Sequence, residues 1–325
     1  MNSKNKKPSF TVESIISQLL LVCKFLFLIF ILKYPREVLD ASRSGLMLWF
    51  NNVLPALLPF VVIVNMMTSL GVVRKISFFI NPFMKTVFKL PGAGGFAFIT
   101  GLISGYPMGA KAVGDLWQSR DITTKEAQQL LTFCNNAGPL FIVGVIGVGL
   151  LGNQTAGYAL WAGHIITALI MGLLTRIQRS SHPRHNFPFR VTSNTMMPNI
   201  GKALGDAVKN AMDALVVVGG LIIFFSVVTR AITMLAGDLP YIGIIAGIIE
   251  VTGGVKILAE GAISPLNLGL IGGVIAFGGF SVHAQALHFT SGTGIKAGQY
   301  ILFKGIGSII AGLVTWLIWS LYILH

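Results

Sequence analysis

The sequence predicts an all-α polytopic membrane protein, built as two inverted repeats that each contain a re-entrant hairpin and a discontinuous span. Apolar residues make up 54% of the 325 residues and charged residues only 11%, well below the roughly 25% that is usual in soluble domains. Apolar runs of about 20 residues, the length that crosses a bilayer as a helix, recur along the chain. Two further apolar stretches, 93–117 and 241–260, are broken at matching places in the two halves. In transporters such a pair points to the substrate site.

The basic residues indicate membrane topology and not binding to nucleic acid. The net charge is +13, but the lysines and arginines fall in loops between apolar runs, as the positive-inside rule describes. We therefore expect the lipid bilayer as a partner and no nucleic acid. The basic loop 178–210 divides the chain and lies in the cytoplasm, as does the N-terminus. Cys23 and Cys134 lie inside apolar runs and predict neither a disulfide framework nor a metal site.

Residues 1–40 contain the cytoplasmic N-terminus and the first span, and residues 41–177 form the first repeat. Pro55 and Pro59 should kink the opening span of this repeat or end a short helix before it. The broken stretch that follows has basic residues on both flanks, so we expect it to enter from the cytoplasm and return there as a re-entrant hairpin. The spans and hairpin predicted for this half of the chain are 13–34, 46–70, 93–117 and 156–175.

A discontinuous span lies between this hairpin and the last span of the first repeat. Thr123 and Glu126 have the spacing of a capping box, which predicts a helix start. The helix should run towards Cys134 and break at 135–139, after which the chain is apolar through 140–151.

The second repeat, 211–325, has the same order of elements. Its predicted spans and hairpin are 211–234, 241–260, 264–289 with an interruption at 278–285, and 298–323. Counted from a cytoplasmic N-terminus, the opening spans of the two repeats run in opposite directions. The hairpins should therefore enter from opposite faces, the architecture associated with alternating access around a midplane site.

Polar side chains at the breaks are the candidates for contact with a substrate, because an unpaired polar group in hydrocarbon costs several kcal/mol. They are Ser104, Tyr106, Lys111, Asn135, Asn136, Glu250, Thr252, Ser281, His283 and Gln285. Helix N-termini at the breaks present free N–H groups, and Lys111 adds a positive charge. Together they favour a small anionic or polar solute.

Several candidates also have a structural interpretation. Glu250 contacts the substrate or a coupling ion, or else pairs with Lys256 or Lys111. Lys111 and Lys256 face the substrate site or else extend to the membrane interface. Asn135 and Asn136 contact the ligand or else cap broken helix ends.

The histidines divide in the same way. His283 takes part in proton coupling or else fills space as a hydrogen-bonded side chain, whereas His164 and His288 are expected to be packing residues. We expect no cofactor beyond a possible coupling H⁺ or Na⁺. We also expect that the chain is not an enzyme, since the sequence contains no nucleophile elbow, HExxH motif or Walker loop.

The residues around the breaks resemble the nucleoside-recognition or Gate domain family, in particular the YlbJ-like sporulation integral membrane proteins. The matching runs are SGYPMGAK at 104–111, CNNAGP at 134–139 followed by Phe141, GIIEVT at 247–252 and GFSVHAQ at 279–285. The resemblance covers roughly 40–320. It implies a fold similar to the concentrative nucleoside transporters and places the family's site at nine of the ten candidates, all except Tyr106. It also implies movement of dipicolinate, a small aromatic dicarboxylate, across a membrane around the developing spore.

The sequence therefore predicts a multi-pass secondary transporter of the cell membrane for a small anionic or aromatic polar solute. Dipicolinate is the first expectation, and a nucleoside or related metabolite is the second. The alternative from another class is a non-transporting membrane scaffold of the spore envelope. Convergence of Lys111, Glu250 and the asparagine pair on one site would favour transport, and scattered contacts would favour the scaffold.

Overall fold

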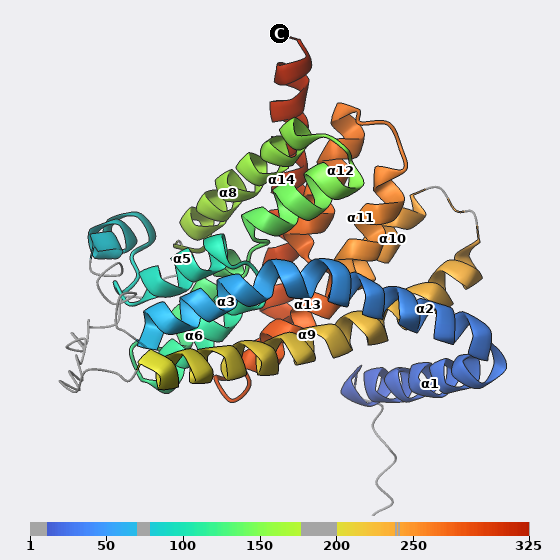
Figure 1. Cartoon of the computed structure of the whole chain (residues 1–325), viewed down its shortest axis with the longest axis horizontal. Coiled ribbons are helices and arrows are strands. Elements are labelled where there is room, and N and C mark those ends of the chain that lie inside the picture. The colour runs from blue at the N-terminus through green and yellow to red at the C-terminus, as the bar shows by residue number, and fades with distance from the viewer. Residues whose placement is uncertain (1–11, 70–78, 177–199, 238, 240, 325) are drawn as a thin grey trace, which may run out of the picture.

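The structure is a computed structural model that describes residues 12–69, 79–176, 200–237, 239 and 241–324 (Figure 1). Within these ranges the secondary structure is helical and contains no strand, which confirms the predicted all-α class. The elements are α1 (Val12–Lys33), α2 (Pro35–Leu48), η1 (Trp49–Val53), α3 (Leu54–Ser69), η2 (Met84–Phe88), α5 (Gly94–Ile103), α6 (Met108–Gln118), α7 (Thr124–Cys134), η3 (Leu140–Leu150), α8 (Gln154–Thr175), α9 (Ile200–Ala236), α10 (Ile242–Ile249), α11 (Val251–Ala259), α12 (Pro265–Phe277), α13 (Gly279–Phe289) and α14 (Ala297–Ile323).

Several helices have the length and composition of membrane spans. In the described part of the chain, four helical segments qualify, at 154–175, 200–236, 265–289 and 297–323. A fifth is formed if the two helical segments 35–53 and 57–67, which meet at 55°, are taken as one bent span. Pro55 and Pro59 lie at and just after this bend, so the predicted kink is confirmed. With its many exposed large apolar side chains, the chain is an integral membrane protein.

The spans predicted from the sequence number seven when the discontinuous one is included, whereas four or five helical segments of the described residues meet the length and composition of a span. α7 and η3 together correspond to the predicted discontinuous span, and each has 11 residues. Neither part has the roughly 20 residues that a helix needs to cross a bilayer alone. The predicted first span corresponds to α1, which is not among the four.

Two helices extend beyond the apolar spans that the sequence predicted. α9 begins at Ile200 and has 37 residues, so the predicted boundary between 210 and 211 lies inside it. Its first turns are rich in alanine, leucine and lysine, all of which favour helix. The charge of the lysines does not prevent helix formation. α2 begins at Pro35, eleven residues before the predicted span, and proline suits the first position of a helix. The rest of the predicted basic loop, 178–199, lies outside the described residues.

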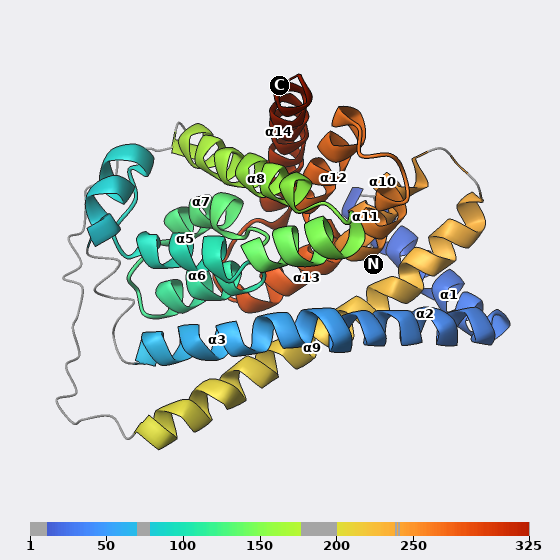
Figure 2. The ribbon, with the colours of Figure 1, turned by 45° about the horizontal axis from the view of Figure 1, so that its top comes forward.

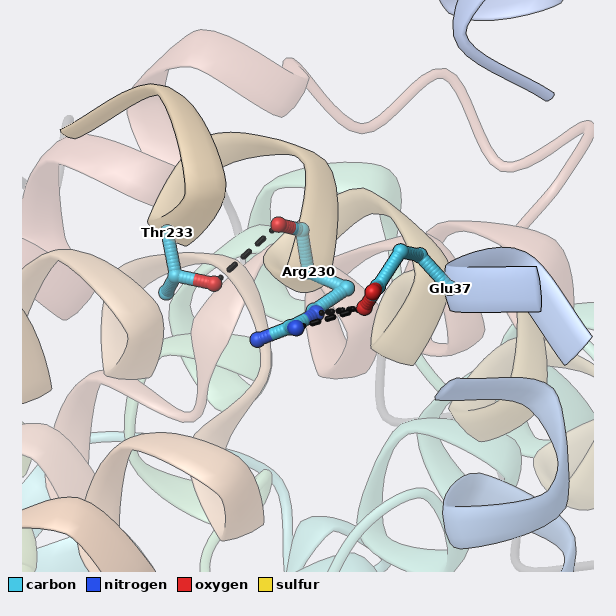
Figure 3. Close-up of polar contacts among 3 residues, drawn as sticks. All are labelled: Glu37, Arg230 and Thr233. Atoms are coloured by element: carbon cyan, nitrogen blue, oxygen red, sulfur yellow. Dashed lines mark hydrogen bonds and ion pairs between the residues drawn. The ribbon is translucent and has the colours of Figure 1, made fainter. Parts of the chain in front are cut away.

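α9 runs antiparallel to the bent helix α2–η1–α3 (Figures 1 and 2). Near one end, Arg230 donates from Nε to Glu37 Oε2 at 2.8 Å (Figure 3), and its backbone oxygen accepts from the Thr233 hydroxyl. Near the other end, Asn65 Nδ2 donates to the backbone oxygen of Ala207 at 3.1 Å. These contacts fix the two long helices against each other along most of their length.

The two broken stretches form helical hairpins, as predicted. α5 and α6 are joined at a tip at 104–107, where Gly105 has φ +79°. α10 and α11 are joined at Glu250, whose backbone is extended at φ −141° and ψ 118°.

Each hairpin is followed by a broken helix, which also agrees with the sequence. α7 begins at the predicted capping box, in which Thr123 N donates to Glu126 Oε2 at 2.8 Å and Glu126 N donates to Thr123 Oγ1 at 3.3 Å. It ends before 135–139, and η3 continues the chain. α12 and α13 are separated by Gly278, at φ +86°.

Hydrogen bonds between loops show at which end of the molecule each hairpin opens. Thr124, just after the loop that follows α6, donates to the backbone oxygen of Thr293, just before α14, at 2.9 Å. Trp319, near the end of α14, donates to the backbone oxygen of Ile263, in the loop after α11, at 3.3 Å. α14 has 27 residues, about 40 Å of helix. The open ends of the two hairpins therefore lie at opposite ends of α14.

Candidate functional site

The tip of the first hairpin packs directly against the break after α7. A Cβ atom at Gly101 or Gly109 would overlap the carbonyl oxygen of Cys134, and one at Gly105 would overlap the backbone nitrogen of Gly138. Only glycine permits this approach of backbone to backbone. The glycines that interrupt the apolar run thus bring the first hairpin onto the break.

The second hairpin meets the break after α12 in the same manner. A Cβ atom at Gly279, which has φ +72°, would lie 2.9 Å from the backbone oxygen of Gly247 and 3.1 Å from the nitrogen of Val251. A Cβ atom at Gly254 would overlap Gly247 within the hairpin. Glu250 at the tip is therefore held beside the start of α13.

Glu250 caps the start of α11. Its side chain is 3% exposed, and its two oxygens accept from the backbone N–H groups of Thr252 and Gly253 at 3.0 and 2.6 Å. A carboxylate at a helix N-terminus also interacts favourably with the helix dipole. In the described part of the chain neither Lys256 nor Lys111 forms an ion pair with it within 4.0 Å, so the predicted lysine pairing is not found.

A network of buried side chains joins the first break to the last two helices. Asn135 Nδ2 donates to the Tyr300 hydroxyl at 2.8 Å, and His283 Nδ1 lies 3.3 Å from the same hydroxyl. Lys304 Nζ donates to the backbone oxygen of Asn135 at 3.0 Å. One turn of α14 therefore holds both the side chain and the backbone of Asn135.

His164 and Asn136 satisfy other groups at the first break. His164 Nε2 accepts from the backbone N–H of Ala137 at 3.0 Å, so this histidine has a specific contact and is not only a packing residue. Asn136 Nδ2 donates to the backbone oxygen of Phe133 at 2.6 Å. This is the contact expected if Asn136 caps the broken end of α7.

The contacts extend across both halves of the chain. Tyr106, at the first hairpin tip, lies close enough to Glu250 and Tyr300 to interact with them electrostatically. Lys304 likewise lies close enough to His164 and His283 to interact with them electrostatically. We call this cluster the polar centre and define it as Ser104, Tyr106, Asn135, His164, Glu250, His283, Tyr300 and Lys304.

Unpaired polar atoms are concentrated in the polar centre. Among the described residues, eight buried side-chain polar atoms have no hydrogen-bond partner, and five of them belong to this cluster. An unsatisfied buried group costs about 1–3 kcal/mol, so a gathering of five indicates a place that receives a ligand or water. The five atoms are Ser104 Oγ, Tyr106 OH, Asn135 Oδ1, His164 Nδ1 and His283 Nε2.

Both histidines can present an N–H donor. Because His164 accepts at Nε2, a neutral ring carries its proton on Nδ1, and this N–H is unpaired. The Tyr300 hydroxyl accepts from Asn135 and has its own proton to donate to His283 Nδ1. With the hydroxyl turned in this direction, a neutral His283 carries its proton on the unpaired Nε2. With the Lys304 ammonium, the polar centre presents several donors to an anion.

The remaining predicted residues have other positions. Lys111 Nζ lies 2.8 Å from Asp115 Oδ2 at a partly exposed site, so its charge is paired outside the polar centre. Thr252, Ser281 and Gln285 are buried in α11 and α13.

Sequence reasoning missed Lys304 and Tyr300. The signal available was a lone lysine inside an otherwise apolar span, because a charged residue at such a position is costly and usually functional. Tyr300 lies one helical turn before it, on the same face.

Comparison with known proteins identifies the family of the chain. The Gate family model, described as nucleoside recognition, matches residues 50–154, which include the first hairpin and the first break. The sporulation integral membrane protein YlbJ of Bacillus subtilis (strain 168) is 31% identical over 340 residues, covering 94% of this chain and 83% of the relative. No solved structure matches the chain. At this identity and coverage, the chain belongs to the YlbJ family of sporulation integral membrane proteins.

Proposed function

We propose that the chain is a secondary transporter that carries a small anion through the polar centre. The observation that carries this proposal is the set of five buried, unpaired polar atoms in the polar centre, which also contains Lys304. The five atoms come from both halves of the chain. A scaffold gains nothing from unpaired buried groups, which lower its stability. A transporter needs them, because they are the groups that a solute satisfies when it binds.

The arrangement of the hairpins supports alternating access. They open at opposite ends of α14, as expected if each is re-entrant and the two halves are inverted repeats. Their tips, at Tyr106 and Glu250, approach each other closely enough to interact. Broken helices that meet at the midplane of inverted repeats form the binding site in many secondary transporters. With a cytoplasmic N-terminus, the first hairpin opens to the cytoplasm.

The chemistry of the polar centre favours an aromatic dicarboxylate over a nucleoside. Carboxylate oxygens accept from the His164 and His283 N–H groups and from the Lys304 ammonium. Phe277 and Phe280, whose rings lie 4.6 and 6.0 Å from that of His283, supply aromatic surface nearby. Dipicolinate, the solute implied by the sequence resemblance, has both features. The membrane would then be one that surrounds the developing spore.

A nucleoside is the second candidate solute, favoured by the description of the matching Gate family. Ribose hydroxyls would donate to the unpaired Asn135 oxygen and to Glu250. This solute leaves the Lys304 charge without a counterion, which is why we rank it second.

Ligand-induced thermal stabilisation of the purified protein tests the proposal. A solute that binds the native state must raise the melting temperature by mass action. Dipicolinate, uridine and malonate are compared, first with the wild type and then with Lys304→Met. The exposed Lys125→Ala serves as a matched loss of charge. We expect a saturable shift with dipicolinate that Lys304→Met loses and Lys125→Ala retains.

The other outcomes decide between the alternatives. A shift with uridine alone would reassign the solute to nucleosides. A shift with malonate equal to that with dipicolinate would show a general dicarboxylate site. No shift with any of the three would contradict the anion site and favour the scaffold.

A further inference from the structure

Lys304 is a buried cation without a carboxylate partner. It lies in the middle of the apolar α14 and is 6% exposed. Within the described part of the chain no acidic side chain lies within 4.0 Å of its ammonium group. A lysine at membrane depth is normally paired or lines a wet cavity, because its charge is expensive to bury. What stabilises Lys304 therefore has to be found in the backbone around it.

The backbone partner is the C-terminal end of a broken helix. Lys304 Nζ donates to the carbonyl oxygen of Asn135, the C-cap residue directly after α7. The last carbonyl groups of a helix have no partner inside the helix and form the negative end of its dipole. In transporters with broken helices, carbonyl oxygens and helix C-termini of this kind coordinate the coupling Na⁺. The ammonium group thus lies where such an inorganic cation would be bound.

Asn135, the partner of this ammonium group, is held through both its side chain and its backbone. Tyr300 and Lys304 are one turn apart on α14, and both contact Asn135. Tyr300 accepts from the Asn135 side chain while Lys304 donates to its backbone. The lysine is held by a built arrangement of buried groups and not by a chance contact.

We propose that Lys304 is a tethered cation that replaces Na⁺ at the end of α7, so that solute binding requires no Na⁺. This inference rests on the proposed transport function and specifies its ion dependence. The fixed positive charge lies near the unpaired N–H groups of His164 and His283. An incoming carboxylate meets a charge that is already present and needs no inorganic ion to bind with it.

The first test uses the wild-type protein and needs no variant. The apparent affinity for dipicolinate is measured by thermal shift in NaCl, KCl and choline chloride at equal ionic strength. A tethered cation predicts the same affinity in all three salts. Loss of the dipicolinate shift when choline replaces Na⁺ would overturn the proposal.

The second test replaces the cation chemically. Lys304→Ala leaves space for a small amine, whereas Lys304→Met fills the same space with an apolar chain. We expect propylammonium chloride to raise the melting temperature of solute-free Lys304→Ala and to leave Lys304→Met and the wild type unchanged. For dipicolinate we expect an affinity at least about tenfold below that of the wild type in Lys304→Ala, since hydrogen bonds to charged groups are strong. Propylammonium, or Na⁺ at the vacated position, should restore this affinity.

The two readouts separate this inference from the proposed function. If no solute stabilises the wild type but propylammonium still rescues Lys304→Ala, the cation position stands and the solute assignment fails. If the solute binds but the alanine and methionine variants respond alike to propylammonium, the tethered cation is wrong and the solute assignment stands. Should Lys304→Ala fail to fold, the salt comparison on the wild type still decides the question.

Discussion

Asn135 and Tyr300 are joined by a buried hydrogen bond of 2.8 Å, although 165 residues separate them in the sequence. Asn135 ends α7 in the first half of the chain, and Tyr300 lies on α14 in the second. The bond therefore connects the first helix break to the last helix. The same hydroxyl lies 3.3 Å from His283 Nδ1 and has its own proton to donate to that nitrogen. A single hydroxyl thus links the first helix break to a histidine in the proposed site.

Tyr300→Phe should destabilise the protein and weaken solute binding together. The change leaves the Asn135 amide and His283 Nδ1 without their partner, at a cost of about 1–3 kcal/mol in the free energy of unfolding. It also frees the proton of His283 to move to Nδ1. Melting temperature and dipicolinate titration measure the two effects. Tyr322→Phe, at an exposed tyrosine on the same helix, is the control, and equal behaviour of the two variants would show that the network has no role.

Gly101→Ala should displace the first hairpin. Its added methyl group would overlap the Cys134 carbonyl oxygen, and backbone cannot yield as a flexible side chain can. Overpacking of this kind costs about 1–3 kcal/mol or more. Gly220→Ala is the matched change, since nothing lies within 4 Å of a Cβ atom there. That variant should be neutral or slightly stabilising. Expression level and melting temperature in detergent compare the two, and equal stability would refute the close packing.

Glu250→Gln should retain the fold but lose gradient-driven uptake. The glutamine side chain keeps one oxygen that can accept from a backbone N–H at the start of α11. Its NH₂ group replaces the second oxygen, so the other backbone N–H loses its acceptor. We expect a loss of about 0.5–2 kcal/mol in stability, as for a weakened N-cap. Glu260→Gln, at an exposed site one helix length away, is the control. Uptake into proteoliposomes is the functional measurement, and full uptake by Glu250→Gln would leave Glu250 with the capping role alone.

The sequence was most informative where chain geometry is determined locally. Glycine and proline inside apolar runs predicted the hairpins and breaks, because such residues cannot continue a plain span. The capping box at Thr123 was also predicted, since its two bonds join residues three apart. The start of α9 was missed because charged residues were taken to end the helix, whereas they extend it beyond its apolar part.

The composition of the site depends on contacts between distant segments and was predicted only in part. Lys304 acquires its role from the end of α7, which no local pattern reveals. Lys111 was favoured because it follows the first hairpin tip, yet Asp115 lies one turn later on the same helix face and takes its charge. That pairing at i and i+4 was visible in the sequence. Position relative to a break was therefore a weaker guide than the search for an unpaired charge in a span.

The two hairpins open at opposite ends of α14, which predicts the loops that are reached from each side of the membrane. With Cys23→Ser and Cys134→Ala as background, single cysteines replace exposed residues at Ser119, after α6, and at Glu260, after α11. In intact cells, a membrane-impermeant maleimide should label the cysteine at 260. The cysteine at 119 should be labelled only after permeabilisation, because the positive-inside pattern places its loop in the cytoplasm.

A third position makes this experiment independent of the assumed orientation. Ser291 is exposed in the loop before α14, and the bond from Thr124 to Thr293 places that loop beside the one that contains Ser119. A cysteine at 291 must therefore behave like the one at 119, whichever face is cytoplasmic. Labelling of 119 and 291 together, and of 260 from the other side, is the result expected for hairpins of opposite entry. If all three cysteines are reached from one side, the two hairpins open to the same face, and α14 does not cross the membrane between their loops.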